Sequence, residues 1–96
     1  MDNLSTFGAR VRYLREQVEE LACAELDRLA ELHRGHVWQI ENGARENPES
    51  KTVRALARVL GCSAGWLIEG EGKAPSGRTV RSAVAAARSA MPDEAA

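Results

Sequence analysis

Aromatic side chains are scarce in this sequence, whose 96 residues include two tryptophans, one tyrosine and one phenylalanine. A hydrophobic core must therefore be built mainly from leucine, valine, isoleucine and alanine. The chain also has no apolar run of membrane-spanning length and no signal-peptide pattern at its N-terminus. These absences predict one small globular domain located in the cytoplasm, with no membrane partner.

Cysteine and net charge are limited as well. Cys23 and Cys62 are the only cysteines, and their spacing fits neither a metal-ligand motif nor a redox motif. We expect them to be small buried hydrophobic residues, with a thiol sensor as the alternative. The net charge of −1 argues against a uniformly basic coat for nucleic acid but leaves room for a local basic face.

Catalytic motifs are missing too. The sequence has no Ser–His–Asp or Cys–His set at a plausible site, and neither glycine-containing stretch, GARE nor GEGKAPSG, follows a predicted strand. The chain also has little room for a deep substrate cleft beside a core. We therefore predict that the protein is not an enzyme and that it requires no cofactor or metal.

Helical periodicity, by contrast, runs through most of the chain. A first helix follows Ser5 or Thr6, either of which is a suitable N-cap. Its apolar stripe consists of Phe7, Val11, Leu14 and Val18. A second helix is indicated by Leu21, Leu26 and Leu29, and Leu32 lies in a tight connection.

Three more short helices are predicted. Val37 and Ile40 form the inner edge of a third helix, which stops at Asn42-Gly43. A fourth helix in KTVRALARVL ends at Gly61, with its apolar face made of Val53, Leu56, Ala57 and Leu60. A fifth runs from a Ser63 cap to Gly70, and its core candidates are Trp66 and Leu67.

Five short helices with a very short turn between the second and the third describe a helix-turn-helix domain. Residues 7–70 resemble the DNA-binding domain of the Cro and phage-repressor family, also called the XRE family. The resemblance is carried by FGARVRYLRE, by Leu26 and Leu32 around the turn, by the IENG that ends the third helix, and by TVRALARVLGCSAGWLIEG. It implies an all-α, five-helix lambda-repressor-like domain, which we assign to residues 1–70. Composition, rather than the resemblance, indicates a linker at 71–78 and an Ala-rich helical tail at 79–96.

The sequence departs from the family pattern at several positions. Cys23 replaces a glutamine that anchors phosphate, and His33 replaces a serine that caps the third helix. Asp27 stands where a small residue is usual, and Glu31 where the turn has glycine. We expect Asp27 and Glu31 to place negative charge near the DNA side.

The predicted recognition helix, residues 33–42, has an outer face suited to the major groove. With Val37 and Ile40 inward, a step of about 100° per residue directs four residues outward and puts Arg34 and His36 on the flanks. The four are Gly35, Trp38, Gln39 and Asn42. The expected base contacts are Arg34 to guanine, Gln39 to adenine and Trp38 to a thymine methyl, with Gly35 allowing close approach.

Phosphate contacts are expected at the two ends of this helix. The resemblance implies that the loop around Asn42, Gly43 and Arg45 grips the strand through backbone N–H groups and the guanidinium. His33 and His36 fit helix capping or phosphate contact better than a metal site, because no third ligand is evident. His33 lies near the inward direction, so a structural role stays open for it.

Each of these residues has a plainer interpretation. Arg34 and Gln39 can be solvated helix residues, Arg45 can decorate a polar loop, and Trp38 can cap the core or meet a protein partner. Glu41 can be an exposed glutamate, but the family pattern pairs it with Arg15 late in the first helix. We favour a structural ion pair that orients the recognition helix.

The Ala-rich tail carries one more helical stripe, made of Val80, Val84, Ala87 and Met91. It can dock on its own domain, on a second subunit or on another partner, or stay disordered; we favour packing across a two-fold axis in a homodimer. The functional prediction is a sequence-specific regulator of double-stranded DNA, a repressor at a pseudo-palindromic operator. The alternative is a protein-binding module, such as an antitoxin-like or adaptor domain.

Overall fold

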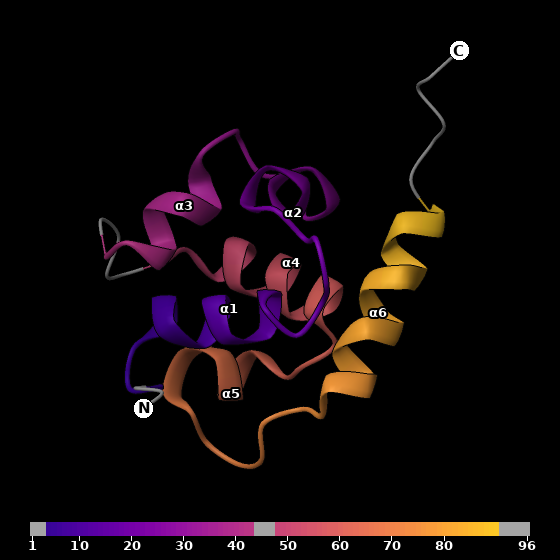
Figure 1. Ribbon diagram of the computed structural model, residues 1–96. Helices are drawn as coiled ribbons and strands as arrows, with labels where there is room; N and C mark the ends of the chain where they lie inside the picture. The colour runs from indigo at the N-terminus through magenta and orange to yellow at the C-terminus, as the bar shows by residue number, and fades with distance from the viewer. Residues whose placement is uncertain (1–3, 44–47, 91–96) are drawn as a thin grey trace.

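The computed structural model describes residues 4–43 and 48–90, which form helices and no strand (Figure 1). In chain order the helices are α1 (Phe7–Arg15), α2 (Cys23–Leu29), α3 (His36–Glu41), α4 (Ser50–Leu60), α5 (Ala64–Glu69) and α6 (Gly77–Ala90). The expected all-α class is confirmed. None of the helices in these residues is long and apolar enough to cross a membrane.

A single hydrophobic core is shared by all six of these helices. Its largest fully buried side chains are aliphatic, as the shortage of aromatic residues requires. They are Val11, Leu14, Leu26, Val37, Ile40, Val53, Leu56, Val59, Leu60, Leu67, Val80 and Val84. Phe7 and Trp66 are the buried aromatic residues of the described chain.

The first helix begins where its local signal predicts. The Thr6 hydroxyl accepts a hydrogen bond from the backbone N–H of Ala9 at 3.1 Å, so Thr6 rather than Ser5 is the N-cap. The helix ends at Arg15, and Val18 is buried in the turn that follows. Leu21 was wrongly expected in the second helix: it is buried in the connection before α2, which starts only at Cys23.

Arg10 is a buried charged residue of α1 that the apolar pattern did not reveal. Its guanidinium donates to the carbonyl oxygens of Leu67 at 2.8 Å, of Leu4 at 2.6 Å and of Ile68. Burial lowers the pKa of this arginine. Leu67 and Ile68 lie in the last turn of α5, whose carbonyl groups have no partner within the helix. Arg10 therefore ties α1 to the end of α5.

The ends of α4 and α5 follow local rules. Gly61, with φ at 73°, ends α4 in the left-handed region that favours glycine. The Ser63 hydroxyl then accepts from the N–H of Trp66 at 3.0 Å and caps α5, which Gly70 ends. The predicted apolar face of α4 and the core positions Trp66 and Leu67 are all buried.

The tail helix α6 docks on its own domain. Val80 and Val84 are completely buried and α6 packs against α4, so the expectation that this stripe packs across a two-fold axis was wrong for these two valines. The helix begins at Gly77 rather than Thr79, because the Ser76 hydroxyl accepts from the N–H of Thr79 at 3.1 Å. Met91 lies outside the described residues.

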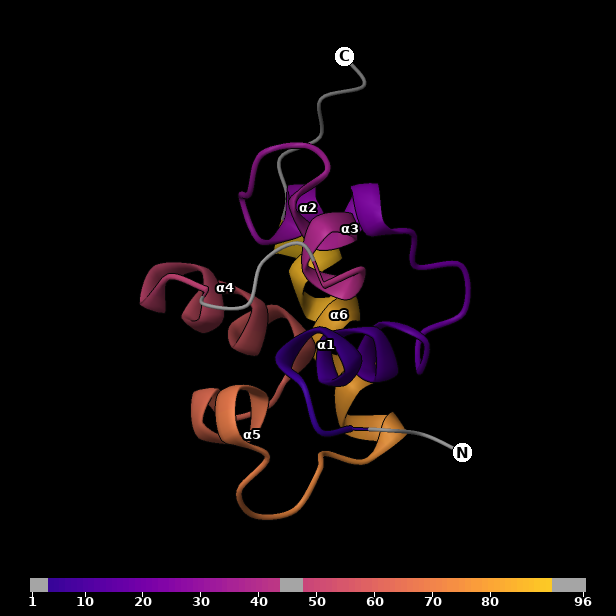
Figure 2. The ribbon, with the colours of Figure 1, turned by 90° about the vertical axis from the view of Figure 1, so that its left-hand side faces the viewer.

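An ion pair and a close helix contact hold α6 in place. Arg88 binds both carboxylate oxygens of Glu25 in α2, at 2.6 and 2.7 Å. In the middle of α6, Ala83 lies close to the end of α4, because a Cβ added to Gly61 would lie 2.8 Å from the Cβ of Ala83. The helix thus spans from α4 to α2 on the side of the domain away from α3 (Figures 1 and 2).

Candidate nucleic-acid interface

Helix α3 lies at the edge of the domain with one face buried and one face open, and it faces the viewer in Figure 2. Val37 and Ile40 are buried, as predicted. On the other side Trp38 is 59% exposed and Gln39 is half-buried. Helices α2 and α3 pack against each other, as expected of a helix-turn-helix unit.

The recognition helix is shorter than predicted at its start. It begins at His36, not at residue 33, because Gly35 adopts a left-handed backbone with φ at 90° that interrupts the helix. His33 and Arg34 therefore lie in the turn before the helix, where both are exposed. A Cβ added to Gly35 would meet nothing within 4 Å, so the glycine is required by its backbone angle and leaves the surface open.

The two histidines lie opposite to expectation. His36, predicted at a flank with phosphate contact, is only 5% exposed, whereas His33, predicted near the inward direction, is exposed. Their rings stack with centroids 4.3 Å apart and planes at 19°. His33 was misplaced because the turn at Gly35 takes it out of the helix. His36 keeps its flank position in α3, but the stacked ring of His33 covers it in part. Phosphate contact by His36 is excluded by its burial.

Metal binding finds no support in this pair. Stacked imidazole rings do not direct two nitrogen atoms at one ion. Across residues 4–43 and 48–90, no group of three or more His, Cys, Asp or Glu side chains is placed to hold a metal ion.

Asp27 is buried at the start of α3, so it does not expose the negative charge that was expected near the DNA side. It is 3% exposed, and its two carboxylate oxygens accept from the backbone N–H groups of Gly35 at 2.9 Å and Val37 at 2.8 Å. Its negative charge is thus placed at the positive end of α3. A cap from an earlier helix leaves no local motif, which is why sequence reasoning missed it.

Glu31 occupies the turn that usually has glycine. Its φ is 59°, the left-handed conformation in which glycine has no penalty. The N–H of Leu32 closes the turn by donating to the carbonyl oxygen of Asp27 at 2.8 Å. The Glu31 side chain is exposed between α2 and α3, so it does place negative charge at this turn.

The end of α3 is fixed to α1 by Arg15 and Glu41. Arg15 Nε lies 2.7 Å from one carboxylate oxygen of Glu41, and Nη2 lies 3.1 Å from the other. The two side chains are 18% and 5% exposed. The hydrogen bond to Glu41 raises the pKa of Arg15, and Nη1 donates to the carbonyl oxygen of Leu21 at 2.8 Å. The pair holds α1, α3 and the α1–α2 connection together.

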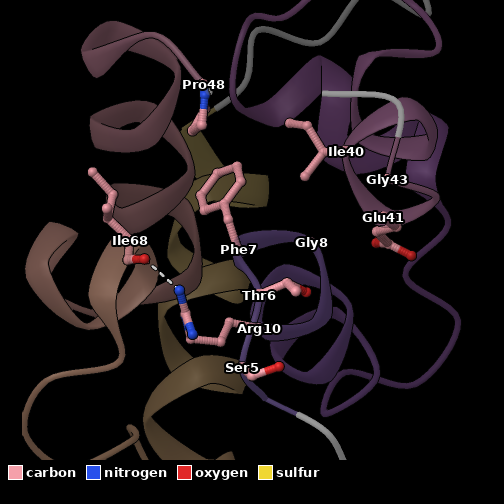
Figure 3. Close-up of a pocket in the computed structure, with 10 residues that line it drawn as sticks. All are labelled: Ser5, Thr6, Phe7, Gly8, Arg10, Ile40, Glu41, Gly43, Pro48 and Ile68. Carbon is pink, nitrogen blue, oxygen red and sulfur yellow. Dashed lines mark hydrogen bonds between the residues drawn. The ribbon is translucent and has the colours of Figure 1, made fainter. Parts of the chain in front are cut away.

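A groove of about 600 Å³ marks the seam between α1, α3 and α5 (Figure 3). It is lined by Ser5, Thr6, Phe7, Gly8, Arg10, Ile40, Glu41, Gly43, Pro48 and Ile68. Gly8 allows α1 and α3 to approach each other closely, because a Cβ at position 8 would lie 2.2 Å from the carbonyl oxygen of Ile40. Ile68, at the rim, is 43% exposed.

The expected phosphate-contact loop is described only in part. Asn42 follows α3, is exposed, and donates from its side-chain amide to the carbonyl oxygen of Trp38 at 2.9 Å. Gly43 is exposed, with φ at 78° and open space where a Cβ would lie. Arg45 lies outside the described residues.

The cysteines are free thiols without catalytic features. Cys23 and Cys62 are both half-buried. Burial raises the pKa of Cys62 to about 11 and also raises that of Cys23. Both thiols therefore stay protonated near neutral pH, which disfavours the thiol-sensor alternative.

Comparison with known families decides the identity of the fold. A family model described as a helix-turn-helix domain matches residues 6–69, well over half of the chain. The chain belongs to the helix-turn-helix domain family. The match covers α1 to α5 and stops before α6, and family membership points to DNA binding. Searches of curated proteins and of solved structures each gave no significant match.

Proposed function

We propose that this helix-turn-helix protein is a sequence-specific transcriptional regulator of the Cro and phage-repressor (XRE) type that inserts α3 into the major groove of DNA. One observation carries the proposal: α3 buries Val37 and Ile40 completely or nearly so, yet leaves Trp38 59% exposed. A large aromatic side chain left in solvent on a short, firmly seated helix is well placed to contact a partner.

The base contacts would come from the open face of α3 and the turn before it. Gln39 would bond adenine, Trp38 would pack on a thymine methyl or sugar, and Arg34 would reach guanine from the turn. The open space over Gly35 supports close approach of the backbone. Phosphate contacts would come from exposed His33, Asn42 and Gly43, with Arg45 kept as a candidate.

The regulator would act as a homodimeric repressor at a pseudo-palindromic operator. Helix α3 has six residues and can read only a few base pairs. Two copies of the protein, bound at half-sites about 34 Å apart, would double the number of base pairs that are read. Light scattering of the full chain measures its mass alone and with DNA, and the mass of a single chain in both cases contradicts the dimer. A DNA site selected without two-fold symmetry also contradicts it.

Selection from a randomised DNA pool, followed by binding measurements at several salt concentrations, tests the function itself. We expect an enriched site and a steep loss of affinity with added salt. Arg34→Ala and Gln39→Ala should each weaken binding to that site by about 1–3 kcal/mol and relax preference at particular base pairs.

Arg78→Ala is the matched control for Arg34→Ala, because it removes the same charge from an exposed position of α6, which lies away from α3. It should keep the base preference intact. Equal binding of the selected site by wild type, Arg34→Ala and Gln39→Ala would show that the recognition face is elsewhere.

A protein-binding module is the second candidate function. Trp38 and Ile68 are the exposed large hydrophobic residues of the described chain, and Glu31 adds negative charge near α3. The same selection separates the two functions. A protein-binding module would enrich no site and would show only weak binding to all sequences.

A further inference from the structure

The start of α3 is held by a side chain of the preceding helix. Asp27 accepts from the N–H groups of Gly35 and Val37 through two different oxygens, at 2.9 and 2.8 Å. Gly35 stands at the N-cap position, and no local side chain caps the helix. The N–H of His36, between the two, donates to the carbonyl oxygen of His33 at 3.2 Å. The N–H groups of residues 35, 36 and 37 are therefore all satisfied within the protein.

The end of α3 is held by different groups. Glu41 is bound to Arg15 on α1, and the carbonyl oxygen of Ile40 faces Gly8 at close range. Gln39 lies near this end of the helix, whereas Arg34 directly precedes Gly35. The two proposed base-reading side chains thus depend on two separate supports.

We propose that Asp27 is a positioning residue for DNA recognition. By holding Gly35 in its left-handed conformation, Asp27 fixes the turn that presents Arg34 to its base pair. Gln39 is oriented independently through the Arg15–Glu41 end of the helix. This role rests on the proposed function, because Asp27 would support the contact between Arg34 and its base pair.

Simple electrostatics makes the opposite prediction for Asp27. Removal of a negative charge from a DNA-binding domain should strengthen its attraction to phosphate at every sequence. A positioning role instead predicts loss of discrimination at one base pair. The sign and the position dependence of the effect therefore separate the two roles.

The experiment uses the full chain and the site that wild type selects. Arg34→Ala and Gln39→Ala first identify the base pair that each side chain reads. Asp27→Asn, which keeps one acceptor oxygen, and Asp27→Ala are then measured against single-base changes of the site. The matched control is Glu71→Gln, which removes one negative charge from the exposed linker.

We expect both Asp27 variants to lose about fivefold or more of the discrimination at the Arg34 base pair, the lower end of a bidentate base contact. Discrimination at the Gln39 base pair should be unchanged, and Glu71→Gln should keep both. Binding is measured at a temperature where circular dichroism shows each variant fully folded. If Asp27→Ala does not fold, the near-isosteric Asp27→Asn carries the test.

Amide hydrogen exchange of the free protein provides a readout without DNA. The N–H groups of Gly35 and Val37 should exchange faster in Asp27→Asn, while that of Asn42 should not change. Retained discrimination at the Arg34 base pair overturns the proposal, and so does an equal loss at both base pairs. A wild-type chain that selects no site overturns the proposed function instead, and the exchange result still shows whether Asp27 caps α3.

Discussion

Gly8 of α1 faces the backbone of Ile40 so closely that a Cβ added to the glycine would lie 2.2 Å from the Ile40 carbonyl oxygen. Backbone atoms cannot move aside as the end of a flexible side chain can, so any larger residue at position 8 must push α1 and α3 apart. We expect Gly8→Ala to lower the free energy of unfolding by about 1–3 kcal/mol, as overpacking does. Thermal unfolding followed by circular dichroism measures the change.

Gly65→Ala is the matched control for Gly8→Ala. Gly65 also lies in a helix, but a Cβ there would meet nothing within 4 Å. The same substitution should raise stability by about 0.5–1 kcal/mol, because alanine loses less backbone entropy than glycine in a helix. Changes of the same sign and size in both variants would contradict the close contact between α1 and α3.

Replacing Glu31 with glycine, the residue that the turn geometry favours, should stabilise the protein. We expect Glu31→Gly to stabilise the protein by about 1 kcal/mol, since φ at 59° is unfavourable for any residue with a Cβ. Glu19→Gly removes the same charge from a turn residue outside the left-handed region, and there the added backbone freedom should destabilise. Chemical denaturation of both variants measures the difference. A loss of stability in Glu31→Gly would show that the side chain, not the backbone, decides the position.

The Arg15–Glu41 pair should be energetically coupled. A double-mutant cycle with Arg15→Ala and Glu41→Ala should give a coupling energy of about 1–3 kcal/mol, because both partners are largely buried and bonded at two points. The neighbouring pair of Arg12 and Glu16 is 60% and 54% exposed and provides the reference. Its cycle should give below about 0.5 kcal/mol. Equal coupling energies in the two cycles would show that the Arg15–Glu41 pair stabilises the protein no more than an exposed surface pair does.

The contact between α6 and α2 should weaken in acid. The hydrogen bonds from Arg88 lower the pKa of Glu25 from its ordinary value of 4.5. A carboxyl group with a lowered pKa in the folded state contributes stability above about pH 4.5, and that contribution is lost as the pH falls through the folded-state value. The difference in melting temperature between wild type and Arg88→Ala should thus be present at pH 7 and disappear in acid. A difference that does not depend on pH would rule out Glu25 as the partner.

Sequence reasoning succeeded where the physical cause is local. Thr6 and Ser63 cap helices through residues three positions away, and Gly61 ends α4 through its own backbone angle. Such signals are contained in a few consecutive residues. The burial of Val37 and Ile40 and the exposure of Trp38 likewise follow from helical periodicity.

The failures concern contacts between residues distant in the chain or a single unusual backbone angle. The left-handed turn at Gly35 shortened α3 and left His33 exposed outside the helix. Asp27 was given a role at the DNA side because nothing in its neighbourhood reveals a bond to residues 35 and 37. The docking of Val80 and Val84 on α4 was one of several open alternatives, since a stripe does not specify the surface that covers it.

Because α6 is the last of the described helices that the ribosome releases, its docking affects how the chain folds during synthesis. Residues 6–69, which carry the family match, emerge before Val80 and Val84, the two valines that α6 buries against α4. Until then the nascent domain has an uncovered apolar surface and lacks the Arg88 contact to α2. Folding during synthesis therefore finishes only when α6 has left the exit tunnel, and exposed apolar surface before that point favours chaperone binding or aggregation.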